Sequence, residues 1–254
     1  AAVWSLGSNA SGTDGVILTA GSAPGIYAFR GDDKNTYWRY EVLGSTWATQ
    51  ANAPGTVKEG GALAYDGGGY ASGYIYALRG DGANAFWRYD IDANSWATRA
   101  NAPANVKSGG ALVYAGGYAY AFRGDGRTDF WRYDPGANSW SSMPAAPAAV
   151  NQGGALTTDG TYVYAFRGAG TNNFWRYDPG TNAWTSQANA PANVKWGGAL
   201  VRLGGYIYGF RGDDKKDFWR YDIAANTWSS LALAPGTVKE GGSLTTDGTY
   251  VYAL

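Results

Sequence analysis

The chain has 254 residues, with 20 basic and 20 acidic side chains and neither histidine nor cysteine. Balanced charge excludes the basic surface of a nucleic-acid-binding protein, and no apolar run is long enough for a transmembrane helix. Without imidazole or thiol groups there is no Ser-His-Asp triad, no cysteine nucleophile and no His- or Cys-ligated metal. We therefore expect a protein that is not an enzyme, with no catalytic residue, metal or cofactor.

An internal repeat dominates the sequence. A short aromatic run ending in Arg-Gly occurs at 26–31, 75–80, 119–124, 163–168 and 207–212, and a sixth copy begins at Val251. The first spacing is 49 residues (75 minus 26) and the next four are 44 each. The pattern predicts a single domain over 1–254, built from one unit repeated along the chain.

Each period contains four strand-like runs. In the third period they are 110–114, 118–123, 130–134 and a run starting near Trp140. Gly, Asp, Asn and Pro fill the short gaps between them, so neighbouring strands can only be antiparallel. The second run alternates large and small side chains, as stacked sheets require. Four antiparallel strands repeated around an axis predict an all-β fold, a β-propeller.

The unit resembles a kelch repeat, in which a Tyr is followed after six residues by a Trp. The matching pairs are Tyr40 and Trp47, Tyr89 and Trp96, Tyr133 and Trp140, Tyr177 and Trp184, and Tyr221 and Trp228. One departure is that Arg-Gly ends the second strand, where the family has a glycine pair; here Gly-Gly precedes the first strand. The chain is similar to secreted kelch-like repeat proteins of bacteria or archaea. Kelch propellers of the galactose-oxidase type carry copper on His and a Cys-crosslinked Tyr, and this chain has neither residue.

The blade count follows from the strands that recur. First and second strands each occur six times, whereas third strands occur five times. We expect six blades, with an N-terminal strand around Trp4 completing an otherwise incomplete C-terminal blade. Five blades is the alternative count.

The Arg of each Trp-Arg-Tyr run is expected to be structural. Its guanidinium should pack between blades and pair with a carboxylate such as Asp134, because Arg both stacks on aromatic rings and donates bidentately.

One face of the ring should collect the turns between second and third strands together with the connections between blades. The connections place four lysines before Gly-Gly, where they should ring the axial opening: Lys58, Lys107, Lys195 and Lys239. The turns contribute Asp32, Asp33, Asp213, Asp214 and Lys215. The ordinary explanation of such lysines is a solvated collar without a ligand. The functional alternative is an axial site for an acidic ligand or an acidic loop of a partner. Calcium at an Asp-rich turn is an open alternative, but no EF-hand-like loop is present.

Trp196 is the tryptophan that the repeat does not explain. The other repeats have Glu59, Ser108, Gln152 and Glu240 at this position. On the axial face, a Trp could anchor a partner, stack on a sugar or pack against a neighbouring loop.

Two functions remain from the sequence. The first is a non-enzymatic protein-interaction or structural module, outside the cell or at its surface, whose partner is another protein or a surface polymer. The alternative is a carbohydrate-binding propeller that uses aromatic side chains of its loop face. Low charge content and a sequon at Asn9-Ala10-Ser11 are the basis for the extracellular expectation.

Overall fold

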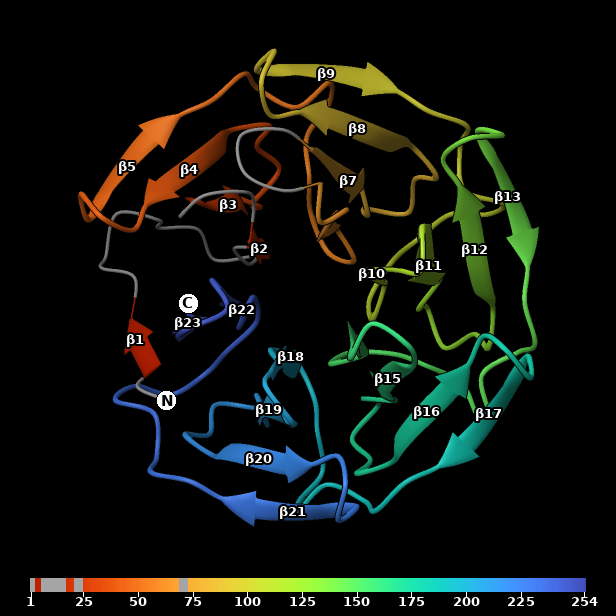
Figure 1. Ribbon diagram of the computed structural model, residues 1–254, viewed down its shortest axis with the longest axis vertical. Helices are drawn as coiled ribbons and strands as arrows, with labels where there is room; N and C mark the ends of the chain where they lie inside the picture. Colours follow the sequence, from red (N-terminus) through yellow and green to blue (C-terminus); the bar gives the residue numbers. More distant parts are fainter. Residues whose placement is uncertain (1–2, 6–16, 21–24, 69–72) are drawn as a thin grey trace.

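The computed structural model describes residues 3–5, 17–20, 25–68 and 73–254. These residues form 23 strands, β1 to β23, and no helix. None of them therefore belongs to a helix able to cross a membrane. The strands are arranged as sheets around a central axis (Figure 1), which confirms the all-β propeller fold.

Five sheets are complete blades of four antiparallel strands. The first two contain β2 (Ile17–Ala20), β3 (Gly25–Phe29), β4 (Tyr37–Glu41) and β5 (Thr46–Thr49), then β6 (Ala62–Tyr65), β7 (Tyr74–Leu78), β8 (Phe86–Asp90) and β9 (Ser95–Thr98). The next two contain β10 (Ala111–Ala115), β11 (Tyr118–Phe122), β12 (Phe130–Asp134) and β13 (Ser139–Ser142), then β14 (Ala155–Thr158), β15 (Val163–Phe166), β16 (Phe174–Asp178) and β17 (Ala183–Ser186). The fifth contains β18 (Ala199–Leu203), β19 (Tyr206–Phe210), β20 (Phe218–Asp222) and β21 (Thr227–Ser230).

A three-stranded sheet occupies the sixth place in the ring. It consists of β22 (Leu244–Thr246), β23 (Val251–Ala253) and β1 (Val3–Ser5), with β23 in the middle. β1 runs parallel to β23 and pairs Trp4 with Tyr252, and Figure 1 shows the two strands side by side. In the complete blades, the third strand pairs with the second and is antiparallel to it, and the fourth strand has the same direction as the second. β1 therefore takes the place of a third strand with the direction of a fourth.

The complete blades in the described chain thus number five, as in the alternative count, and a smaller sheet closes the ring. The first strand of each sheet lies innermost, and β2, β6, β10, β14, β18 and β22 contact one another in a closed circle. The sixth sheet is the incomplete closing blade that the sequence predicts, and the expected N-terminal strand around Trp4 joins it as β1.

The core lies between neighbouring blades. The small face of β11, Ala119 and Ala121, packs against Tyr76 of the preceding blade, while its large face, Tyr120 and Phe122, packs toward the following blade. All five side chains are buried. The alternation of large and small residues in the sequence therefore specifies how adjacent sheets interlock.

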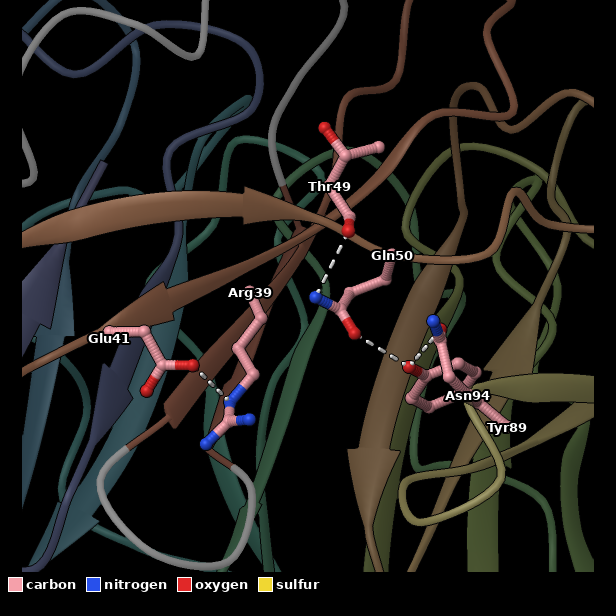
Figure 2. Close-up of polar contacts among 6 residues, drawn as sticks. All are labelled: Arg39, Glu41, Thr49, Gln50, Tyr89 and Asn94. Atoms are coloured by element: carbon pink, nitrogen blue, oxygen red, sulfur yellow. Dashed lines mark hydrogen bonds and ion pairs between the residues drawn. The ribbon is translucent and has the colours of Figure 1, made fainter.

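Of the five repeated arginines, Arg39 forms the expected ion pair, with Glu41 at 3.1 Å (Figure 2). The other four lie over a tyrosine ring and form no ion pair with another described residue. The Arg132 guanidinium lies 4.4 Å from the ring centroid of Tyr118, in the adjacent strand of the same sheet. Asp134 instead accepts hydrogen bonds from the backbone amides of Gly136 and Ala137 at 2.8 and 3.0 Å, within its own turn. No ion pair between Arg132 and Asp134 occurs in the described chain. Both amides donate to Oδ1 of Asp134, and the Arg132 guanidinium has the Tyr118 ring as its partner in a cation–π contact.

Polar contacts connect the outer strands of neighbouring blades. Figure 2 shows the Tyr89 hydroxyl between Asn94 Oδ1 at 2.7 Å and Gln50 Oε1 at 3.1 Å. Asn94 also accepts a hydrogen bond from the Ala51 amide at 2.8 Å, and Trp96 Nε1 donates to the Ala51 carbonyl at 2.9 Å. Gln50 and Ala51 follow the last strand of one blade, whereas the other three residues belong to the next. The Tyr and Trp of the repeat are thus parts of a joint between blades.

Candidate functional site

The glycine pairs bring the inner strands close together at one end of the axis. A Cβ built on Gly154 would lie 2.6 Å from Val150 Cγ1 and 2.7 Å from the carbonyl oxygen of Gly109 in the preceding blade. At Gly197, a Cβ would collide with the Lys239 carbonyl oxygen of the next connection. Only glycine allows this approach, which leaves the axis itself free of side chains at these positions.

An axial pocket of about 420 Å³ opens where the inner strands begin. Its wall is formed by five Gly-Gly-Ala-Leu or Gly-Gly-Ser-Leu segments, and each segment is preceded by a residue with a longer side chain. We call these five residues the axial ring: Glu59, Ser108, Gln152, Trp196 and Glu240. The volume is within the range of about 300–1,000 Å³ typical of ligand sites.

Backbone hydrogen bonds fix the axial ring in position. The amide of Asp213 donates to the Trp196 carbonyl at 2.9 Å, and the amide of Asp81 donates to the Glu59 carbonyl at 2.8 Å. Both donors belong to the Arg-Gly-Asp turns between second and third strands. Their left-handed φ angles, 59° at Asp213 and 55° at Asp81, aim the amides toward the axis. The Arg-Gly-Asp tripeptides thus support the ring, while its side chains remain available.

Trp196 is the prominent apolar side chain of this pocket. Four large apolar side chains are exposed in the described chain: Leu43, Trp196, Leu233 and Tyr250. Of these, Trp196, with 45% of its surface exposed, lines the pocket. The structure therefore places it on the axial face, as its position before Gly-Gly predicts, and its indole is not packed away beneath a neighbouring loop.

The lysines and the Asp-rich turns lie together on this face. Lys58 Nζ is 2.8 Å from Asp33 Oδ2, Lys195 Nζ is 3.2 Å from Asp213 Oδ2, and Lys239 Nζ is 3.5 Å from an Asp214 oxygen. These pairs are partly exposed, so each contributes little to stability. Their effect on the site is larger, because they hold the lysine ammonium groups at the turns between second and third strands. We call these turns, together with the paired lysines, the rim of the pocket.

The lysine collar is correspondingly displaced from the pocket. Lys58 lines it, whereas Lys107, Lys195 and Lys239 do not. Lys107 forms no ion pair within the described ranges. The collar expected at the opening lies one residue earlier in the chain than the ring that surrounds the pocket. Each lysine is the first residue of a tight turn, closed at Lys58 by a hydrogen bond from the Gly61 amide to the Lys58 carbonyl at 2.9 Å, and the ring residue is the second.

The remaining candidates belong to the rim. Lys215 forms an isolated backbone bridge with Val238, and Asp32 has a left-handed φ of 54° in its turn. Within the part of the chain that the structure describes, no three acidic side chains converge as a metal site would require. Each turn aspartate that pairs with lysine is already balanced, so the turns offer calcium few uncommitted carboxylates.

Sequence reasoning did not single out Glu59 and Glu240 as site residues. The sequence did contain a signal for them, because both occupy the same repeat position as Trp196, directly before a glycine pair. Neither carboxylate makes a hydrogen bond or ion pair with another residue of the described ranges, and both side chains are exposed. The pocket therefore carries two uncompensated negative charges beside one paired lysine.

Comparison with known proteins identifies the architecture. No protein-family model matches the sequence, and no curated protein matches it. The solved structure of YjhT matches with a TM-score of 0.72 and 15% sequence identity, over 91% of this chain and 87% of that one. This likeness shows a shared β-propeller fold. A propeller is compatible with a protein-interaction role, but one fold supports many functions, and the site has to carry the argument.

Proposed function

We propose that this propeller is a non-enzymatic module that binds a partner protein through the face that carries the axial pocket. The observation that carries the proposal is the exposure of Trp196 at the centre of that face. The repeat does not require this residue, and a partly exposed Trp framed by polar groups is a common anchor in protein interfaces.

The surrounding surface supports the same proposal. A rim of paired lysines and aspartates encloses the axial ring, in which the exposed Trp196 lies among Glu, Ser and Gln side chains. Aromatic residues are enriched in protein interfaces, and a polar rim is usual there. Four of the five ring residues, Glu59, Ser108, Gln152 and Trp196, accept a backbone hydrogen bond from a turn amide, so binding would cost little ordering of the main chain there. Few charges in the sequence and the sequon at residues 9–11, which lie outside the described residues, favour a position outside the cell or at its surface.

Paired affinity capture tests the proposal. The wild-type chain and Trp196→Ala serve as baits for proteins of the source organism, and Leu43→Ala provides a control at an exposed apolar side chain that does not line the pocket. We expect one identified partner to bind the wild type and the control and to be lost with Trp196→Ala. The purified partner must then reproduce this difference by calorimetry. Equal binding to all three baits would contradict the proposed face.

Carbohydrate binding is the second candidate, and the pocket itself favours it. Its volume suits a small saccharide, and Trp196 together with Gln152 and Ser108 offers an aromatic platform with hydrogen-bonding groups. A glycan array probed with the wild-type chain and with Trp196→Ala tests this candidate. Hits that disappear in the variant would replace the protein partner with a glycan.

A further inference from the structure

We propose that the axial pocket receives a single lysine or arginine side chain carried on an exposed loop of the partner. This inference rests on the proposed protein-binding function and names the chemistry that the pocket recognises. It reverses the expectation of an acidic ligand that the lysine pattern suggested.

First, the charge of the pocket wall favours a cationic ligand. Among the described residues, the charged side chains that line the pocket are Lys58, Glu59 and Glu240. Lys58 is engaged with Asp33 at 2.8 Å, whereas the two glutamates lack a cationic partner among the described residues. An incoming cation would find two carboxylates to pair with, and an incoming anion would have to displace Asp33 from Lys58.

The placement of Trp196 carries the second step. It precedes β18, and Glu240 precedes β22, the next inner strand around the axis. The two segments touch, because a Cβ on Gly197 would collide with the Lys239 carbonyl oxygen. An indole and a carboxylate therefore come from adjacent segments at one side of the pocket. Tryptophan is the aromatic ring that binds cations best, and a nearby carboxylate adds a charge-assisted hydrogen bond.

The size of the pocket carries the third step. About 420 Å³ accommodates one long side chain but not a folded segment. Lysine and arginine have long apolar stems that can lie along the apolar parts of the wall while the charged end reaches the carboxylates. The five glycine pairs keep the entrance open along the axis. A partner loop resting on the rim could thus insert one basic side chain.

The indole N–H signals of the chain allow a direct test by two-dimensional NMR. Substitution Trp196→Phe assigns the Trp196 signal among those of the 12 tryptophans. The probes are N-acetyl-arginine amide, N-acetyl-lysine amide, the uncharged isostere N-acetyl-citrulline amide, N-acetyl-glutamate amide and lactose. Each is titrated into wild type, Glu59→Gln, Glu240→Gln and Glu41→Gln. The last variant removes the remaining glutamate of the chain, which lies in β4 and does not line the pocket.

We expect the arginine and lysine probes to shift the Trp196 signal and the citrulline and glutamate probes to leave it unchanged. Glu59→Gln and Glu240→Gln should each weaken binding at least several-fold, Glu41→Gln should leave it unchanged, and added salt should weaken it. A shift of equal size with citrulline, a shift with lactose alone, or no shift with either cation would overturn the proposal. In those cases the proposed function stands if Trp196→Ala still abolishes capture of the partner, and falls only if capture persists.

Discussion

Trp140 donates its indole N–H to the carbonyl oxygen of Ala100, 2.9 Å away across the boundary between two blades. Ala100 in turn donates its amide to Asn138 Oδ1 at 3.0 Å, and Asn138 also accepts from the Tyr133 hydroxyl at 2.7 Å. Trp140 and Asn138 thus hold both polar groups of a single backbone residue in the preceding blade, and Tyr133 holds Asn138 in place. Trp228 forms the same bond with Ala188 at 2.9 Å.

Two substitutions of Trp140 should therefore distinguish the contribution of its hydrogen bond to stability from the contribution of its packing. Trp140→Phe keeps the aromatic contacts with Phe86 and Tyr133 and should lower the free energy of unfolding by about 1 kcal/mol. Trp140→Ala loses both and should cost about 3 kcal/mol. Urea unfolding followed by circular dichroism measures the two values. Equal losses for the two variants would show that the hydrogen bond dominates.

Gly154→Ala tests the close approach of the inner strands. The added Cβ would meet Val150 and the Gly109 carbonyl oxygen, and we expect a loss of about 2–3 kcal/mol from overpacking. Gly236→Ala is the matched control, because nothing lies within 4 Å of a Cβ at that position, and it should change stability by less than about 0.5 kcal/mol. Similar melting temperatures for the two variants would rule out the crowding.

Ala169 occupies a left-handed turn position, with φ at 56°, where the other complete blades have aspartate. This conformation costs an alanine about 1–2 kcal/mol because its Cβ crowds the following carbonyl. Ala169→Gly removes the strain and keeps the amide that donates to the Gln152 carbonyl at 2.9 Å. After the entropic cost of glycine, we expect a gain of about 0.5–1 kcal/mol, measured by thermal unfolding. A decrease would mean that the turn does not strain alanine.

The buried tyrosines should make the fold sensitive to alkaline pH. Burial raises the pKa of Tyr76, Tyr177 and Tyr221 to about 12, from an ordinary value of 10.0. The unfolded chain loses these protons first, so the stability present below pH 10 should fall progressively as the pH rises from about 10 to 12. Tyrosinate absorbance recorded together with circular dichroism measures this. Ionisation of these tyrosines near pH 10 without loss of structure would contradict their burial.

Much of the fold could be predicted because the same pattern of strands and turns occurs in every period of the sequence. The alternation in residues 118–122 predicts both the strand and its two packing partners, and the Tyr133–Trp140 spacing marks two strands that pair directly. The missing third strand of the last period was also visible. The joining of an N-terminal strand around Trp4 was predicted too and is confirmed. The direct pairing of β1 with β23, in the place of a third strand, was not predicted, because no local pattern specifies the register of a partner almost a whole chain away.

The site was predicted only in part, for reasons that are also local. Trp196 stood out as a departure from the repeat, and its face follows from the order of the strands. The charge of the pocket did not follow. Glu240 lies directly before a glycine pair, and Lys195 lies one residue further from its own pair. The sequence does not show which of these two positions points into the pocket, because the direction of a side chain there depends on the neighbouring turns. The Lys195 side chain pairs with Asp213, and the next residue in the chain, Trp196, lines the pocket.

The parallel pairing of β1 with β23 sets the order in which the ring can assemble. Each complete blade joins strands that are neighbours in the chain, and such contacts close short loops. Val3 and Val251 are 248 positions apart (251 minus 3) and are held by one of only three residue pairs between these strands. Closing so long a loop is entropically unfavourable and yields few contacts. The blades can form one beside another, and we expect the seam between β1 and β23 to join last and to open first.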